Sequence, residues 1–271
     1  MKRSFYSAAA VVCAIVMCFS GCGASSAMSQ DDGAVDIDLE AIENERVTLA
    51  SQAAQEAPNS DDEIDFDRAW FDDCVFLGDS MILGLSFYGE TSGMLGNAEY
   101  ICAPSLGWVN SQWDLLDENA VHPFYNGSLV LLQDACMVSN SKKAVIQLGM
   151  NDIGMYTMDE TFEAADELIA KMRGVTPNVQ IYLITINPMI GIKETGSLNN
   201  KKIREYNERL KAFASEHSCG LIDSWSAIAN ENGELPIEIC NDVDSQGIHL
   251  NYEGEGILAR CIVKTISEYV G

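Results

Sequence analysis

The sequence predicts an α/β fold, a three-layer α/β/α sandwich around a central parallel sheet of about five strands. Short runs rich in Val, Ile and Leu alternate with longer helical segments, and this alternation is typical of parallel strands joined by right-handed crossovers. About 200 residues follow the N-terminal region, enough for one substantial core. The predicted strands are 74–78, 97–102, 144–149, 179–185 and 220–222, and the predicted helices are 80–87, 107–117, 159–174, 198–217 and 252–269.

The first predicted strand ends abruptly in a Gly-Asp-Ser sequence. The run from Cys74 to Leu77 is rich in β-branched and aromatic residues, as a buried strand requires. Gly78 permits a tight exit from the strand, and Asp79 and Ser80 can cap the following helix. Ser80 is therefore expected at the C-terminal edge of the sheet, where the active sites of open α/β sheets lie.

Two further polar segments stand at the ends of predicted elements. The strand that ends at Leu148 is followed by Gly149-Met150-Asn151-Asp152. Gly247-Ile248-His249-Leu250-Asn251 directly precedes the last predicted helix. An acyl-transfer site needs a hydroxyl nucleophile, a base and hydrogen-bond donors for the oxyanion. Ser80, His249 and Asn151 supply these three kinds of group.

Between the second and third strands, the region 118–142 is predicted to be irregular. Asn126-Gly127 indicates a turn, and the segment 129–137 is predicted to contain a short helical run.

With these motifs the chain resembles the SGNH/GDSL hydrolases. Gly78-Asp79-Ser80 is similar to the first sequence block of that family, and Gly149-Met150-Asn151-Asp152 is similar to the third. His249, within Gly-Ile-His-Leu-Asn, matches the fifth block, and Gly107 is the best candidate for the lone glycine of the second. The resemblance spans roughly residues 72 to 271 and implies the flavodoxin-like SGNH fold.

The resemblance also implies roles for these residues. Ser80 would be the nucleophile and His249 the general base. The backbone N–H groups of Ser80 and Gly107 and the side-chain amide of Asn151 would form the oxyanion hole. No cofactor is implied.

The chain departs from the family's pattern just before the histidine. The family usually carries Asp three residues earlier, where this chain has Gln246, and the nearest acid is Asp244. That Asp normally holds the imidazole in the right tautomer and stabilises the imidazolium. Three alternatives remain: Gln246 or a backbone carbonyl orients His249, Asp244 or Asp242 takes the place of the acid, or the enzyme is slow or inactive. The first is the preferred prediction.

Other classes of protein lack support in the sequence. Gly-x-Ser-x-Gly, the nucleophile elbow of another serine-hydrolase fold, does not occur. Neither a zinc-ligand motif nor a Walker A sequence occurs, so no metal site is predicted. The formal net charge of −25 argues against a nucleic acid partner, because phosphate binding needs clustered Lys and Arg.

The N-terminus predicts a bacterial lipoprotein. Lys2 and Arg3 precede a short apolar core, and Phe19-Ser20-Gly21-Cys22 resembles a lipobox. We therefore expect a signal peptide over 1–21, a lipid on Cys22, and an extracytoplasmic protein bound to the membrane through that lipid alone. Residues 22–70 are predicted to be an acidic disordered tether, and residues 71–271 the hydrolase domain.

Six cysteines remain after Cys13, Cys18 and Cys22 are set aside. An even number of cysteines outside the cell permits disulfides, but several of these lie where small buried apolar residues are expected. Most are therefore predicted to be buried thiols, without excluding a bridge. The six are Cys74, Cys102, Cys136, Cys219, Cys240 and Cys261.

The sequence thus predicts a lipid-anchored serine esterase that cleaves a carboxylic ester, either a small acyl ester or an O-acetyl group on a glycan. The alternative is a catalytically degenerate domain of the same fold that serves as a surface binding module. Gln246 is the only residue that favours this alternative.

Overall fold

The computed structural model describes residues 64–117 and 120–270. The predicted signal peptide, Cys22 and most of the predicted tether lie outside the described residues. By its internal contacts the chain divides into two units, residues 1–58 and 59–271, and the following description concerns the second. Within the described residues, no helix is both long enough and apolar enough to cross a membrane.

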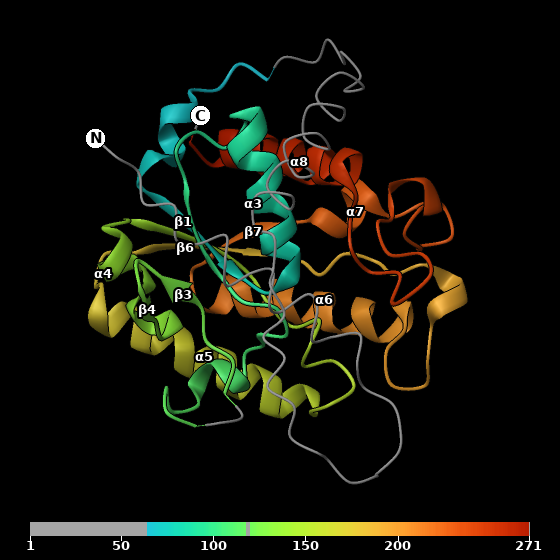
Figure 1. Ribbon diagram of the computed structural model, residues 1–271, viewed down its shortest axis with the longest axis horizontal. Coiled ribbons are helices and arrows are strands. Elements are labelled where there is room, and N and C mark those ends of the chain that lie inside the picture. The colour runs from blue at the N-terminus through green and yellow to red at the C-terminus, as the bar shows by residue number, and fades with distance from the viewer. Residues whose placement is uncertain (1–63, 118–119, 271) are drawn as a thin grey trace, which may run out of the picture. The chain divides into compact units, whose positions relative to one another are not determined.

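A five-stranded parallel sheet forms the centre of the domain (Figure 1). The strands stand in the order β2-β1-β5-β6-β7, so that β1 lies between β2 and β5. All neighbouring strands of this sheet run parallel, which confirms the predicted fold class. The strands are β1 (Cys74–Gly78), β2 (Glu99–Cys102), β5 (Lys143–Gln147), β6 (Gln180–Ile184) and β7 (Gly220–Ile222).

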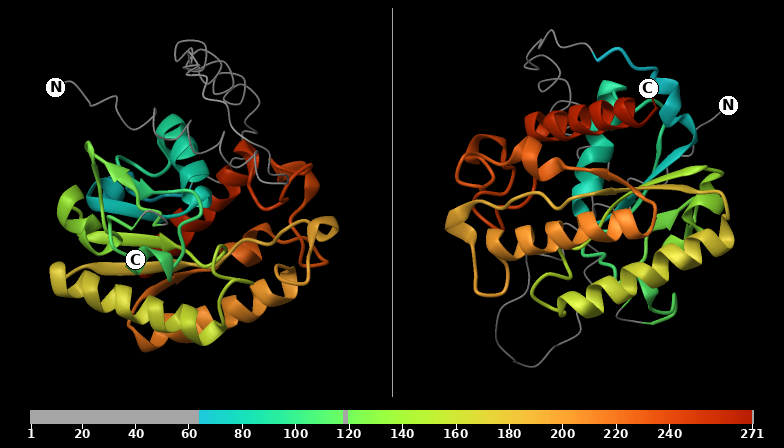
Figure 2. Two further views of the ribbon diagram at one scale, coloured as in Figure 1. Left: turned by 60° about the horizontal axis from the view of Figure 1, so that its bottom comes forward. Right: turned by 180° about the vertical axis from the view of Figure 1, so that it is seen from behind.

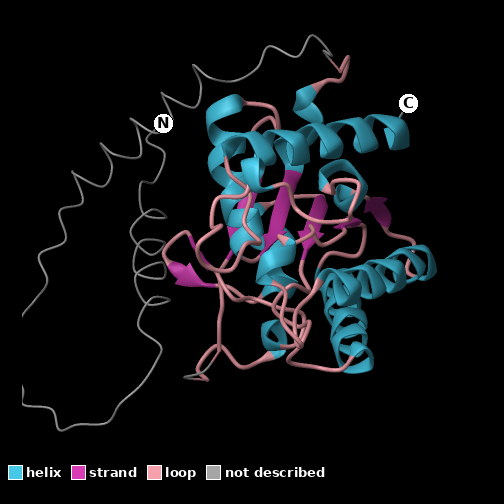
Figure 3. Cartoon of the chain, turned by 90° about the vertical axis from the view of Figure 1, so that its right-hand side faces the viewer, coloured by secondary structure: helices cyan, strands magenta, loops and turns pink. Residues whose placement is uncertain are grey.

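Helices cover both faces of this sheet (Figures 2 and 3). Along β1, Phe76 packs into the core on one face of the sheet, whereas Val75 and Leu77 pack into the core on the other face. Because both faces are buried, the strand is an unbroken apolar run instead of an alternating one. The helices are α3 (Ser80–Ser92), α7 (Ser224–Ile228) and α8 (Tyr252–Val270) on one side and α4 (Ala135–Ser139), α5 (Met158–Val175) and α6 (Asn200–Glu216) on the other.

Helix α5 illustrates how the sequence sets the ends and faces of these helices. Thr157 accepts a hydrogen bond from the backbone N–H of Glu160, whose carboxylate accepts one from the Thr157 N–H. This capping box satisfies two donors that the first turn would otherwise leave free. The buried side chains recur at helical spacing and face the core: Thr161, Phe162, Ala165, Leu168, Ile169 and Met172.

The helix predicted over 107–117 is wrong. Only a 3₁₀ turn, Asn110–Gln112, forms there. The backbone N–H groups of Trp108 and Val109 donate to the Asp152 carboxylate at 2.9 and 3.1 Å. A side chain that is distant in sequence thus ties this segment down as a loop against the strand ends.

The irregular region 118–142 contains one small feature that the sequence indicated. The described part forms a two-stranded antiparallel ribbon, β3 (Phe124–Tyr125) with β4 (Ser128–Leu129). Asn126 and Gly127 join these strands with φ values of 49° and 88°, the backbone that favours an Asn-Gly turn. The helical run expected over 129–137 is shorter and later, a 3₁₀ turn at Leu132–Asp134 followed by α4.

The six cysteines of the domain are free thiols, as predicted, but only Cys74, Cys136 and Cys240 are buried, and the other three are partly exposed. Burial raises the pKa of the Cys102 thiol to about 12 and that of Cys136 to about 11, so both are protonated at neutral pH. They act as small apolar side chains of the interior.

Candidate active site

Ser80 is the first residue of α3, directly after the end of β1. The Asp79 carboxylate caps the helix by accepting a hydrogen bond from the Met81 N–H at 2.9 Å. Gly78 makes this sharp passage possible, because a Cβ there would stand 2.5 Å from the Gln147 carbonyl oxygen of β5. The serine is therefore held at the carboxyl end of the sheet, as predicted, and its side chain is half-buried.

His249 joins Ser80 to an acid. Its Nε2 lies 2.9 Å from Ser80 Oγ, and its Nδ1 lies 2.8 Å from Asp242 Oδ2. An ionised carboxylate can only accept, so Nδ1 carries the hydrogen and Nε2 is left to accept the hydroxyl proton of Ser80. This is the arrangement of a nucleophile, a base and an orienting acid.

The acid is Asp242, and the preferred prediction that Gln246 or a backbone carbonyl orients His249 is wrong. Asp242 is one of the two acids named in the second alternative, and the other, Asp244, does not contact the imidazole. The Asp242 backbone oxygen accepts from the N–H groups of Ser245 and Gly247 at 2.9 and 3.1 Å. This loop carries residues 244–246 outward, where they are exposed, and brings the Asp242 side chain back against His249.

Asp242 is fixed on both of its oxygens. Its Oδ1 accepts from the backbone N–H groups of Ile248 and His249, both at 3.0 Å. Burial alone would raise the pKa of this carboxyl, but the hydrogen bonds and the charge of His249 outweigh it and hold the pKa well below its usual value. Asp242 is thus a carboxylate at any pH near neutrality.

Asn151 and Gly107 lie together, as predicted, at the same end of the sheet. Asn151 Nδ2 donates to Asp79 Oδ2 at 2.8 Å and to the Leu106 carbonyl oxygen at 3.0 Å. Through the Leu106–Gly107 peptide, Asn151 links the loop that carries Gly107 to the residue before Ser80.

Two buried acids outside the predicted catalytic set, Asp79 and Asp152, support this arrangement. Burial raises the pKa of Asp79 to about 7, although the Met81 N–H and the charge of His249 pull the other way. Burial also raises the pKa of Asp152, against the opposing hydrogen bonds from Val109 and Trp108. Asp79 lies in the Gly-Asp-Ser motif and Asp152 in the Gly-Met-Asn-Asp motif. Their place in these two motifs is the sequence feature that could have identified them.

Two buried aromatic side chains, Trp108 and Tyr206, connect the loop that carries Gly107 to the end of the strand before Asn151. The indole Nε1–H donates to Tyr206 Oη at 2.7 Å, and Tyr206 Oη donates to the Leu148 carbonyl oxygen at 2.7 Å. Gly149, at φ 127°, passes so close to Tyr206 that a Cβ would lie 2.4 Å from its ring. The chain can therefore turn from β5 toward Asn151 only with glycine at this position.

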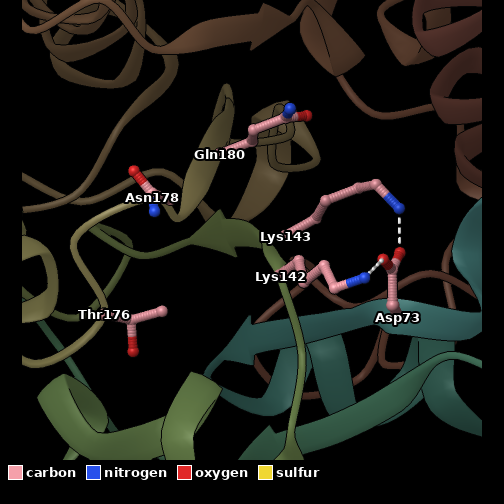
Figure 4. A pocket seen from close by; sticks show the side chains of 6 residues that line it. All are labelled: Asp73, Lys142, Lys143, Thr176, Asn178 and Gln180. Carbon is pink, nitrogen blue, oxygen red and sulfur yellow. Dashed lines mark hydrogen bonds and ion pairs between the residues drawn. The ribbon is translucent and has the colours of Figure 1, made fainter.

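A pocket of about 280 Å³ lies at the end of the sheet opposite to Ser80, where the strands begin (Figure 4). Its lining includes residues at the amino ends of β5 and β6, whereas Ser80 follows the carboxyl end of β1. Lys143 is held there by Asp73 and by the Trp70 carbonyl oxygen. The lining residues are Asp73, Lys142, Lys143, Thr176, Asn178 and Gln180.

Comparison with known proteins shows which family the chain is similar to. The model of the GDSL-like lipase/acylhydrolase family matches residues 76–257, more than half of the 271-residue chain. The match extends from β1, just before Ser80, to the first turns of α8, just after His249. A search of curated proteins found no match.

Solved structures share the fold at low sequence identity. A proposed acylhydrolase from Bacteroides fragilis is 18% identical, with a TM-score of 0.56 over 82% of this chain and 96% of the other. A GDSL-like lipase from Bacteroides thetaiotaomicron is 17% identical, with a TM-score of 0.52 over 83% and 98%. A catalytic mutant of Axe2, an acetylxylan esterase from Geobacillus stearothermophilus, is 14% identical, with a TM-score of 0.51 over 71% and 93%.

Proposed function

Because the chain belongs to the GDSL-like lipase/acylhydrolase family and is thus an ester-cleaving hydrolase, we propose that it is a serine esterase with Ser80 as nucleophile and His249 as general base. The continuous contact from Ser80 Oγ through the His249 ring to Asp242 carries this proposal. It requires no cofactor, since the side chains present supply the nucleophile and both proton-transfer positions.

In the proposed reaction, Ser80 Oγ attacks the acyl carbon while its proton passes to His249 Nε2. The carbonyl electron pair moves to the oxygen and gives a tetrahedral oxyanion. His249 then donates the proton to the departing alcohol oxygen as the carbon–oxygen bond breaks and the acyl-enzyme forms. Water, deprotonated by the same nitrogen, attacks the acyl-enzyme and releases the acid, and the proton returns to Ser80.

Asp242 supports both proton transfers in this scheme. It holds the hydrogen on Nδ1, so that Nε2 is the free base, and its charge stabilises the imidazolium that forms. Because its pKa is held low, the carboxylate retains this charge throughout the neutral range.

We propose a short acyl ester as the substrate, with an O-acetyl group on a carbohydrate as the specific case. The shared fold of Axe2, an acetylxylan esterase, supports this choice. The test is acetate release from acetylated xylan by the full chain, measured beside hydrolysis of p-nitrophenyl acetate and p-nitrophenyl octanoate. Faster turnover of the acetyl ester and release of acetate from xylan are expected. A clear preference for octanoate with no acetate release would contradict the proposed substrate.

The alternative function is a catalytically degenerate domain that serves as a surface binding module. The observation that favoured it no longer does. It rested on Gln246 standing where the family carries an acid, whereas Asp242 provides a carboxylate at 2.8 Å from His249 Nδ1. No other feature of the site favours it.

We also propose that the protein is an extracytoplasmic lipoprotein anchored through Cys22. The support is the sequence alone: a short apolar core, then Phe19-Ser20-Gly21-Cys22. Mass spectrometry of the mature N-terminus is expected to find Cys22 as the first residue and to find lipid on it. An unmodified N-terminus on protein released into the medium would contradict the anchor.

A further inference from the structure

Three successive backbone N–H groups follow Leu106, and they are held in two different ways. The N–H groups of Trp108 and Val109 donate to the buried carboxylate of Asp152, a side chain that is 1% exposed. The Gly107 N–H instead donates to the side-chain Oδ1 of Asn110 at 2.7 Å. One of the two backbone donors that the family resemblance assigns to the oxyanion hole, the Gly107 N–H, is therefore occupied by a side chain of the protein itself.

The side chain of Asn110 is placed so that it can release the Gly107 N–H. It is only half-buried, and its other contact is from Nδ2 to the carbonyl oxygen of Ser105 at 2.9 Å, in an exposed turn. Ser105 has a φ of 65° and follows Pro104, with the Leu106 N–H donating to the Ala103 oxygen at 3.2 Å. This hydrogen-bonded turn has proline second and a positive φ third, the pattern of a type II turn, and its closure does not depend on Asn110.

The same peptide unit is occupied on its other side. The Leu106 carbonyl oxygen accepts one hydrogen of the Asn151 amide, and Asp79 accepts the other. Both amide hydrogens of Asn151 are thus used within the protein, as is the Gly107 N–H. A small rotation of the Leu106–Gly107 peptide would loosen the contact to Asn110 and the contact to Asn151 together.

We propose that Asn110 is a positioning residue whose side-chain oxygen holds the Gly107 N–H until the substrate's acyl oxygen takes its place; this rests on the proposed esterase function. When Ser80 Oγ bonds to the acyl carbon, the electron pair of the carbonyl moves to its oxygen. That oxygen then accepts the Gly107 N–H, and the Asn110 side chain turns toward solvent. No atom of Asn110 is consumed, and its amide returns when the acyl group leaves.

This exchange discriminates between the substrate and its transition state. Replacing the Asn110 carbonyl oxygen by a neutral ester carbonyl exchanges one neutral acceptor for another. Replacing it by an oxyanion forms a charge-assisted hydrogen bond, which is about twice as strong. The Gly107 N–H thus leaves Asn110 completely only when negative charge develops on the substrate oxygen. The exchange therefore raises kcat more than it strengthens binding of the substrate in its ground state.

Two substitutions of Asn110 separate this role from a structural one. Asn110→Asp keeps the size of the side chain and the acceptor, but its negative charge holds the Gly107 N–H and opposes the oxyanion. We expect its kcat to fall about tenfold or more with little change in KM, since a lost oxyanion donor costs on the order of 10² to 10³ in kcat. Asn110→Ala vacates the donor, and its kcat is expected to equal or exceed that of the wild type.

A purely structural role predicts the reverse order, because the isosteric Asp would preserve the turn better than Ala. Ser105→Asp is the matched control. It adds a negative charge to the same exposed turn while Asn110 keeps its contact with the Gly107 N–H, and Asp tolerates a positive φ. Its kcat is expected to stay within about threefold of the wild type, well short of the loss expected at Asn110. An equal loss in Ser105→Asp and Asn110→Asp would overturn the proposal.

The second measurement is the crystal structure of the full chain after reaction with a fluorophosphonate, whose phosphoryl oxygen mimics the oxyanion. We expect that oxygen on the Gly107 N–H and the Asn110 side chain turned away. A retained Asn110–Gly107 hydrogen bond in the adduct would overturn the Asn110 proposal and leave the esterase proposal standing. Failure of the wild type both to label and to cleave any ester would overturn both.

Discussion

Replacing Ser80 by alanine is expected to abolish ester hydrolysis and fluorophosphonate labelling together. Among residues 64–117 and 120–270, the Ser80 hydroxyl is the hydrogen-bond partner of His249 Nε2, and removal of a triad serine costs about 10⁶ in kcat. We expect a loss of at least about 10⁴-fold, with the remainder limited by background hydrolysis. The measurement is acetate release from acetylated xylan together with labelling of the intact chain.

Ser86→Ala is the matched control for this prediction. Ser86 lies on the same helix, and its hydroxyl donates to the Leu83 carbonyl oxygen at 2.7 Å without contacting His249. Its activity should remain close to that of the wild type. Far-ultraviolet circular dichroism should show both variants folded. If Ser80→Ala retained more than a tenth of the activity, the nucleophile would have to be sought elsewhere.

The second large effect is expected at Asp242. Asp242→Asn replaces the carboxylate at His249 Nδ1 by a neutral amide, which no longer stabilises the imidazolium and can favour the wrong tautomer. In a serine protease this exchange costs about 10⁴ in kcat. We expect a loss on the order of 10³ to 10⁴ here, measured as kcat on p-nitrophenyl acetate across pH 5 to 9.

Gln246→Ala and Asp244→Asn are the matched variants in the same loop. Both side chains are exposed and lie away from the imidazole, so each should change kcat less than about threefold. A loss in Gln246→Ala that matches the loss in Asp242→Asn would restore the role first predicted for the glutamine. Because Asp242 also holds the backbone at residues 248 and 249, the unfolding midpoint of each variant should be recorded beside its activity.

The strands and the positions of Ser80 and Asn151 could be predicted because each depends on a local pattern, whereas His249 could be located by its resemblance to a family motif. Buried parallel strands are short apolar runs, and a polar residue just beyond such a run must lie at the edge of the sheet. The helix predicted at 107–117 failed because its outcome depends on Asp152, which captures two N–H groups from 43 and 44 residues away in the sequence.

The partner of His249 could not be fixed from sequence for a related reason. Asp242 lies seven residues before the histidine, and it reaches the ring only because the loop between them reverses at Ser245 and Gly247. The family pattern, with Asp three residues before the histidine, assumes a short loop between the two. In this chain a longer loop brings the Asp242 carboxylate to His249 Nδ1. The signal peptide and lipid anchor remain predictions, because they lie outside the described residues.

The hydrogen bond between Ser80 and His249 joins residues 169 positions apart in the sequence. Ser80 lies near the start of the described domain and His249 near its end, so this contact closes a loop that spans most of the domain. Closing so long a loop is among the entropically costliest steps of assembly, and it is repaid only when α8 packs against α3 and the sheet. In the proposed mechanism, esterase activity therefore reports that the segment around His249 has docked: a chain cleaved before His249 would carry the Gly-Asp-Ser turn but lack the proposed base.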